Sequence, residues 1–307
     1  MKPQNIYYYL KPFIPRPLQI LLRRNIILNK LKRFSKVWPI DPEARHAPKD
    51  WTGWPHGKRF AFILTHDVDT MRGHEQCKQL MNMEKCLGFR SSFNIVPRRY
   101  VVSPQLIYEL KKDSFEVGVH GLYHDGKLYN SRALFNERAI HINTYLKTWG
   151  AVGFRSPAMH HRLDWLFDLN ILYDASTFDT DPFEPQPDGV RTIFPFWVES
   201  VSYQKGYVEL PYTLPQDFTL FVLMKEESID IWKRKLDWIV ENGGMVLLNC
   251  HPDYMNFKDG CMVKEGYPSG FYQEFLEYVK QRYDGLYWHV LPKEIASFWE
   301  SNFKRNK

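Results

Sequence analysis

Acidic residues are absent from the first 36 positions of the chain, although the 307 residues include 35 Asp and Glu. The same 36 positions hold nine Lys and Arg, while the whole chain has a net charge of +6, so the remainder is slightly acidic. The basic character therefore belongs to an N-terminal arm. In residues 18–36, apolar residues recur at helical spacing with basic residues between them. This is typical of a helix on an anionic membrane surface, and equally of a helix packed on a domain with a solvated basic face.

Long apolar stretches are also absent. No run approaches the roughly 18 apolar residues of a membrane-spanning helix. The apolar stretches of the arm are interrupted by Pro12, Pro15 and Pro17, and no small-residue cleavage site follows, so no secretory signal is expected. We therefore expect a cytoplasmic protein, with peripheral contact with an anionic membrane through residues 1–36 as one option. No recognition motif accompanies the charge, which argues against a nucleic-acid partner.

Cysteine is scarce, with four residues and no Cys-x-x-Cys pair. A chain of this size does not need a disulfide scaffold, so Cys77, Cys86, Cys250 and Cys261 are expected to be reduced thiols. Aromatic residues are plentiful instead, at 16%. Core filling is the simplest explanation of this excess, and flat faces that stack on sugar rings are the functional alternative.

The main part of the chain has the pattern of an α/β domain. Residues 37–58 are rich in Pro, Trp and Gly and are predicted to form an irregular linker. Strand-like and helix-like segments alternate from there on, which predicts a parallel sheet built from βαβ units. The strands are nearly continuous apolar runs, as expected when helices cover both faces. We therefore predict an arm and linker over residues 1–58, and a barrel or twisted open sheet over residues 59–307.

The individual segments follow from apolar runs and helix signals. Strands are predicted at residues 60–65, 91–97, 115–120, 151–157, 171–177, 208–212, 244–251 and 286–291. Helices are predicted at residues 74–88, 103–113, 131–149, 162–170, 226–242 and 270–281, and after the last strand. Ser103 and Pro104 are typical of the start of a helix, and Gly150 is typical of the end of one.

Polar residues gather at the carboxyl ends of these strands. In a parallel α/β sheet or barrel these ends meet at one rim, where loops build active sites, so we expect the side chains to converge. The residues are Asp67, Asp69, His120, Arg155, Asp174 and His251.

Asp67 and Asp69 follow the first strand, and residues two apart on a strand share a face. Two such close carboxylates repel each other unless a cation lies between them or one is protonated, so a metal site is one interpretation. The other interpretation is that one Asp caps a helix and the other forms a turn. His66 lies between Thr65 and Asp67 and is expected to face away from both carboxylates.

His120 and His124 place two imidazoles on one face if the turn between them is helical. Two imidazoles and one carboxylate, with a position left open, are a normal catalytic Zn²⁺ site. His251 ends a buried strand and is followed by Pro252, which suits a general acid or, equally, a packing residue. Cys250 points to the opposite face and is expected to be buried, so the two residues cannot form a dyad.

Two further polar residues suggest supporting roles. Arg155 at the same rim would orient a carboxylate and lower its pKa. Asp174 could hold His251 in the required tautomer, and Asp179 and Asp181 compete for that role. All three aspartates are also ordinary turn residues.

These residues, in this order, resemble the motifs of the polysaccharide deacetylase family (carbohydrate esterase family 4, the NodB-homology domain). The family motif Thr-Phe-Asp-Asp-Gly corresponds to Thr-His-Asp-Val-Asp at residues 65–69. The motif His-Ser/Thr-x-x-His corresponds to residues 120–124, and Arg-x-Pro-x-Gly to residues 155–159. The strand that ends in a His corresponds to residues 247–251, and the Asp-containing stretch corresponds loosely to residues 173–176.

The resemblance implies a distorted (β/α)7-type barrel, here preceded by a basic helical arm. It also implies a divalent metal, commonly Zn²⁺, bound by Asp69, His120 and His124. The substrate would be an acylated sugar or glycan precursor from which an acyl group, most simply acetyl, is removed.

The resemblance further implies that Asp67 is the base, that Arg155 orients it, and that His251 is the acid. Because the adjacent Asp-Asp of the family is Asp-Val-Asp here, the roles of Asp67 and Asp69 as base and ligand are open to exchange. Gly121 and Met159 also depart from the motifs, which indicates a divergent branch with its own substrate.

Three other functions fit parts of the pattern. A formyl-amide or cyclic-amide hydrolase would use the same site, whereas a non-catalytic carbohydrate-binding protein would not need both an acid and a base. A membrane-surface adaptor would act through the arm. With a cytoplasmic location, the substrate would be a lipid-linked or nucleotide-linked sugar of surface-glycan synthesis.

Overall fold

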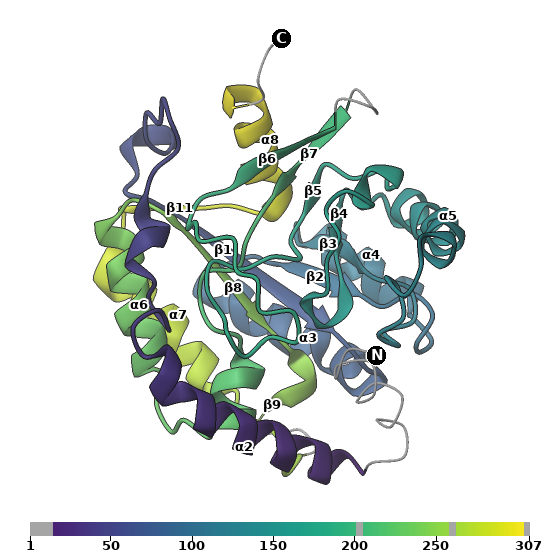
Figure 1. The fold of residues 1–307 in the computed structure, drawn as a ribbon, viewed down its shortest axis with the longest axis horizontal. Helices are drawn as coiled ribbons and strands as arrows, with labels where there is room; N and C mark the ends of the chain where they lie inside the picture. The colour runs from purple at the N-terminus through teal and green to yellow at the C-terminus, as the bar shows by residue number, and fades with distance from the viewer. Residues whose placement is uncertain (1–14, 201–204, 258–261, 304–307) are drawn as a thin grey trace.

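The computed structural model describes residues 15–200, 205–257 and 262–303. Figure 1 shows the strands in the middle of the domain with helices around them. The parallel strands of the main sheet are β1 (Phe60–Val68), β2 (Ser92–Ile95), β3 (Glu116–His120), β4 (Gly153–Arg155), β5 (Tyr173–Asp174), β7 (Lys205–Glu209), β8 (Met245–Cys250) and β11 (Tyr287–His289). The antiparallel strand β6 (Phe196–Ser200) lies at the edge beside β7.

The sheet curls into a distorted barrel, which confirms the predicted α/β class. Neighbouring strands run in the order β8, β1, β2, β3, β4, β5 and β7, and β11 pairs with the first residues of β1. After β7 the chain reaches β8, where the Thr213 amide donates to the Leu247 carbonyl at 3.0 Å. Every residue of β1 and β8 is buried, as expected for strands covered on both faces.

The helices follow the predicted alternation. They are α2 (Arg16–Phe34), α3 (Met71–Leu87), α4 (Pro104–Lys112), α5 (Arg132–Trp149), α6 (Asp230–Glu241), α7 (Gly270–Tyr283) and α8 (Pro292–Phe303). The Ser103 hydroxyl accepts from the Leu106 amide at 3.3 Å and so begins α4 as predicted. Gly150 ends α5 with a φ of 56°, a left-handed conformation that glycine adopts without strain.

A predicted helix and an edge strand are among the differences from the prediction. The helix expected at residues 162–170 is a single 3-10 turn, Leu166–Asp168. Asn143 holds this turn by donating to the Asp168 carbonyl at 2.9 Å and accepting from the Asn170 amide at 2.8 Å. Strand β6 was not predicted because it is a partly exposed edge strand without a continuous apolar run.

The N-terminal arm and the linker both pack on the domain. Helix α2 lies along its outside, below α6 and α7 in Figure 1, and contacts a π-helical segment, η6 (Phe218–Met224). Within the linker, the rings of Trp51 and Trp54 lie against Trp299 of α8 at centroid distances of 5.5 and 6.2 Å. The predicted domain boundary at residue 58 stays a prediction.

Cys77, Cys86 and Cys250 are free thiols, as expected, and Cys250 is buried. Cys261 lies outside the described residues. Every helix in the described ranges is too short or too polar to cross a bilayer.

Candidate active site

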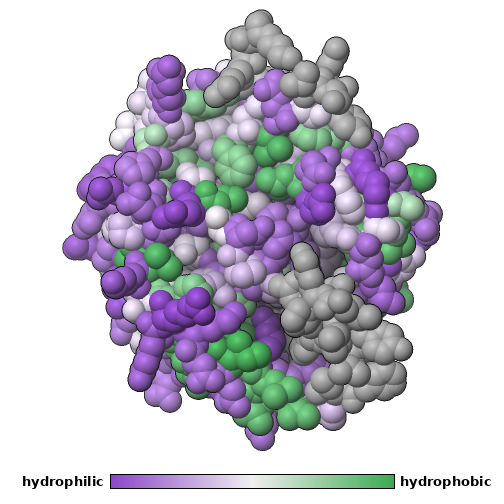
Figure 2. Space-filling view, in the orientation of Figure 1, coloured by the Kyte–Doolittle hydropathy of each residue, from purple (hydrophilic) through white to green (hydrophobic). Residues whose placement is uncertain are grey.

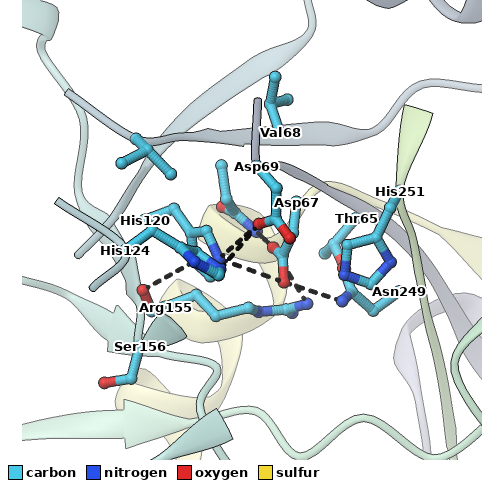
Figure 3. A network of polar contacts seen from close by, with 12 residues as sticks. Thr65, Asp67, Val68, Asp69, His120, His124, Arg155, Ser156, Asn249 and His251 are labelled. Carbon is cyan, nitrogen blue, oxygen red and sulfur yellow. Dashed lines mark hydrogen bonds and ion pairs between the residues drawn. The ribbon is translucent and has the colours of Figure 1, made fainter. Parts of the chain in front are cut away.

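Asp67 and Asp69 lie at the carboxyl end of β1, where the strand gives way to α3. Their side chains share one side of the chain while Val68 points the other way, as the period of a strand requires (Figure 3). His120 and His124 lie on one side of the two carboxylates and His251 on the other. His66 faces away, and its Nε2 atom lies 2.8 Å from Oε1 of the buried Glu84.

Asp69, His120 and His124 form a compact cluster. Asp69 Oδ1 lies 3.0 Å from His124 Nε2 and 3.3 Å from His120 Nε2. One carboxylate oxygen and two imidazole nitrogens all lie within 4.8 Å of one another. This is the distance range that ligands around one divalent cation would span.

The turn that joins His120 to His124 is not helical, so the two imidazoles do not share a helix face as the spacing would have allowed. Gly121 has a φ of 60° and His124 a φ of 53°, both left-handed. A side chain at Gly121 would also clash, since a Cβ atom there would lie 2.5 Å from Pro157 Cγ. The left-handed turn brings His124 back beside His120 and requires a glycine at position 121.

The donor set fits a divalent cation. His120 Nδ1 lies 3.0 Å from the Arg155 carbonyl oxygen and donates to it, so Nε2 is the nitrogen that faces the cluster. Asp69 Oδ1 is buried and, within the described ranges, accepts no hydrogen bond of regular geometry. Burial opposes ionisation of Asp69, but His124 and His120 outweigh it and hold the pKa of Asp69 well below its usual value. The carboxylate is therefore ready to bind a cation.

Asp67 is held by two amides and an arginine. Asn94 Nδ2 donates to its Oδ1 atom and Asn249 Nδ2 to its Oδ2 atom, both at 2.9 Å. Nη1 of the buried Arg155 lies 3.5 Å from Asp67 Oδ1. Burial raises the pKa of Asp67, but the charges of Arg155, His120 and His251 and the hydrogen bond from Asn94 lower it below its ordinary value. Arg155 lies where an orienting residue is needed, and that role stays a prediction.

His251 is held by Asp217, and the expectation that Asp174 does so is wrong. Asp217 Oδ1 lies 2.7 Å from His251 Nδ1, and Asp217 Oδ2 accepts from the His251 amide at 2.8 Å. Tyr267 donates to the same Oδ2 atom at 2.9 Å. Burial lowers the pKa of His251, but Asp217 overcomes this and the value is raised to about 10. His251 is therefore an imidazolium at neutral pH.

The three aspartates considered for that role have other partners. Asp174 accepts from the Ser176 hydroxyl at 2.6 Å. Asp179 forms a buried ion pair with Lys235. Asp181 accepts from the Tyr212 hydroxyl at 2.9 Å.

Asp253, two residues after His251, holds the loop that carries Asp69. Its Oδ2 atom accepts from the Asp69 amide at 2.9 Å, and its Oδ1 atom accepts from the Thr70 amide at 2.8 Å. Asp253 therefore occupies the amino end of α3 in place of a side chain of that helix. Gly73 makes room for it, because a Cβ atom there would lie 2.1 Å from Asp253 Oδ2.

No family model and no curated protein matches this sequence. Solved structures do match its fold. A protein from Mycobacterium smegmatis described as a polysaccharide deacetylase is 17% identical with a TM-score of 0.63, over 83% of this chain and 95% of its own. A protein from Pseudomonas aeruginosa PAO1, also described as a polysaccharide deacetylase, is 15% identical with a TM-score of 0.63, over 88% of this chain and 100% of its own. The chain has the polysaccharide deacetylase fold. An allantoinase structure shares the fold as well, with 15% identity and a TM-score of 0.65 over 88% of this chain and 99% of its own.

Within this polysaccharide deacetylase fold, the cluster opens into a cavity of about 540 Å³. Asp67, Asp69, both cluster histidines and His251 line one part of it, and side chains of α2 and η6 line another. Glu184 also lines it and is buried. Burial and the neighbouring Asp181 raise the pKa of Glu184 to about 8, so the cavity contains a carboxyl group that is largely protonated at neutral pH.

Sequence reasoning missed four residues of this site. Asn94 and Asn249 lie at the carboxyl ends of β2 and β8, so the strand-end rule could have found them. Asp253 lies two residues after His251 in the sequence, so its closeness to a candidate catalytic residue could have pointed to it. No sequence feature pointed to Asp217 as a site residue, because it precedes the π-helical η6 in a segment without regular strand or helix periodicity.

Proposed function

We propose that the protein is a metal-dependent hydrolase that removes an acyl group, most simply acetyl, from an amino sugar or glycan precursor. The observation that carries the proposal is the arrangement of three groups around one cavity. A metal-binding cluster, a carboxylate fixed by two amides and an arginine, and an imidazolium fixed by Asp217 all line it. A volume of about 540 Å³ is suitable for a sugar with its acyl group.

Asp69, His120 and His124 would hold the metal, for which one oxygen and two nitrogen donors favour Zn²⁺. When bound, the cation would lower the pKa of water and stabilise negative charge on the acyl oxygen. Asp69, and not Asp67, is assigned as the ligand because it lies closer to both imidazoles. His120 Nε2 is 3.3 Å from Asp69 but 3.9 Å from Asp67.

Asp67 would act as the base. Asn94 and Asn249 each donate to one of its oxygens, and the charge of Arg155 at 3.5 Å lowers its pKa. The carboxylate therefore stays ionised, and its position is set before the substrate arrives. It would take a proton from the water that attacks the acyl carbon.

His251 would act as the acid. At neutral pH it carries the proton that the leaving nitrogen or oxygen needs when the bond to the acyl carbon breaks. The products are then a carboxylate and a free amine or hydroxyl group. Asp217 keeps the proton-bearing Nδ1 atom occupied, so Nε2 is the atom left to face the cavity.

An amide hydrolase acting on a formyl or cyclic amide is the second candidate. The structural likeness to an allantoinase favours it, and the same residues would serve. A carbohydrate-binding protein without activity is less favoured, because binding alone would not require both Asp67 and His251 in these settings.

A substrate panel with controlled metal content tests the proposal. Acetylated amino sugars, O-acetyl glycans, formylated amino sugars and allantoin are each offered to the metal-free and Zn²⁺-loaded protein, and acetate, formate or ring opening is measured. We expect turnover of an acylated sugar only by the loaded protein, and little by Asp67→Asn despite an unchanged metal content. Turnover of allantoin alone would favour the second candidate. Undiminished turnover without metal would overturn both.

A further inference from the structure

We propose that the outer face of α2 binds the surface of an anionic membrane, and that the sugar entering the cavity is carried by a lipid of that membrane. The second half rests on the proposed function, whereas the membrane contact does not. The proposal depends on a difference between the two faces of α2: the inner face packs on the domain, and the outer face is exposed.

The inner face of α2 is fixed to the domain. Ile20 and Ile27 are 4% and 2% exposed. Arg24 donates to the carbonyl oxygens of Leu223 and Val222 in η6 at 3.0 and 3.1 Å. The helix is therefore a packed element with a defined outside.

The outer face carries exposed apolar side chains, with the exposed Asn25 and Asn29 among them. Four large apolar side chains of this face are between 43% and 48% exposed; they are Leu18, Leu21, Leu22 and Leu28. Ile26 is 54% exposed and also lines the cavity, so it lies where this face meets the cavity. Figure 2 shows hydrophobic residues gathered at the lower edge of the molecule, where α2 lies in Figure 1. Single exposed apolar residues are ordinary, but four on one helix face indicate an interaction surface.

Charge favours an anionic lipid surface as the partner. Lys32, Arg33 and Lys36 are exposed at and just beyond the carboxyl end of α2. No acidic residue occurs in the first 36 positions to offset them. Basic residues beside an apolar helix face are attracted to anionic headgroups while the apolar side chains enter the interface. A second copy of the chain would instead bring a second basic arm against the first.

The same helix is a wall of the cavity. Arg23, Ile27 and Lys30 line the cavity that contains Asp69, and the Arg23 guanidinium lies 5.1 Å above the Phe218 ring. A helix seated on a membrane would therefore place the cavity beside the lipid headgroups. A sugar attached to a lipid could then reach Asp69 without leaving the surface, and the two cationic side chains suit a phosphate between sugar and lipid.

Vesicle co-sedimentation of the full-length protein tests the membrane contact. Vesicles of phosphatidylcholine alone are compared with vesicles that also contain phosphatidylglycerol. We expect binding to the anionic vesicles that weakens as salt is added. The triple variant Leu18→Gln, Leu21→Gln, Leu22→Gln should bind about tenfold more weakly or worse, because it removes apolar area that enters the interface.

The matched control replaces exposed apolar residues outside α2. Val101 and Ile140 are 82% and 68% exposed, and Val101→Gln, Ile140→Gln should bind vesicles as the unchanged protein does. Lys32→Gln, Arg33→Gln should reduce the preference for anionic vesicles without touching the packed face. Equal melting temperatures show that the variants are folded.

Three results would overturn the membrane contact: no sedimentation with anionic vesicles, equal binding by the triple variant, or a dimer in sedimentation velocity that the triple variant abolishes. Measuring turnover distinguishes failure of the membrane contact from failure of the proposed function. Hydrolysis of a water-soluble acyl sugar without vesicle binding leaves the proposed function standing and removes the inference. If the proposed function and the membrane contact are both correct, the triple variant should hydrolyse a water-soluble acyl sugar normally. It should hydrolyse an acyl sugar anchored in vesicles more slowly than the unchanged protein does.

Discussion

Replacing Asp217 by asparagine removes the negative charge from the contact that raises the pKa of His251 to about 10. Asparagine keeps the size of the side chain, and its oxygen can still accept the Nδ1 proton. Its amide nitrogen replaces the oxygen that accepts from the His251 amide and from Tyr267, so the change removes those contacts together with the charge. Burial, which lowers the pKa of His251, is then opposed mainly by Asp67 and Asp69. If the pKa returned to an ordinary value of about 6.5, the protonated fraction at pH 8 would fall about thirtyfold.

The assay is the pH dependence of kcat/KM for the acyl sugar found in the substrate panel. The unchanged protein should keep its rate up to about pH 10 so far as His251 is concerned, and Asp217→Asn should lose rate at a pH lower by up to about 3.5 units. Metal content should not change, because Asp217 lies outside the cluster. Asp174→Asn is the control and should leave unchanged the pH at which kcat/KM falls on the alkaline side (the alkaline limb of the profile). An unchanged alkaline limb in Asp217→Asn would refute the role of His251 as the acid.

Other changes test the remaining parts of the account. His124→Ala should lower Zn²⁺ affinity at least about tenfold by removing one of three ligands, as measured by metal titration; stoichiometric tight binding would contradict this. Asp67→Asn should keep the metal but reduce kcat by about 10²–10⁴-fold, as measured by acetate release; a near-normal rate would remove Asp67 as the base. Lys235→Met should lower the free energy of unfolding by about 3–5 kcal/mol in urea denaturation, because it leaves the buried Asp179 carboxyl without its ion-pair partner. Asp253→Ala should cost about 1–3 kcal/mol in the same assay by leaving two amides unpaired, and a smaller cost would show that water replaces the carboxylate.

The fold was predictable from the sequence because the strands of a covered parallel sheet are buried on both faces. Apolar runs such as residues 60–65 and 244–251 therefore stand out, and glycine and serine signals set the ends of α4 and α5. Strand β6 could not be found in this way, because at a partly exposed edge the apolar run is lost.

The site was predictable only where a residue's position in the sequence fixes its position in space. Asp67, Asp69, His120, Arg155 and His251 lie at or just beyond strand ends, so the topology alone brings them to one rim. The contact between Asp217 and His251 joins residues 34 positions apart and depends on how an irregular segment packs. Asp174 was a reasonable choice by the strand-end rule, but its carboxylate accepts from Ser176 instead.

That α2 forms a wall of the cavity could not be predicted from the sequence either. Its pattern of apolar and basic residues allowed a membrane helix or a packed helix as alternatives. The structure shows that one helix has a packed inner face and an exposed apolar outer face. Only the coordinates reveal that the packed face also lines the cavity.

Zn²⁺ titration of the metal-free protein by calorimetry, paired with the same titration of His120→Ala, tests the central claim most directly. We predict one tight site per chain that is lost in the variant, with hydrolysis of the acyl sugar rising in proportion to the occupied site. Absence of a tight site, or a tight site that survives the loss of His120, would contradict the assignment of Asp69, His120 and His124 as the metal centre.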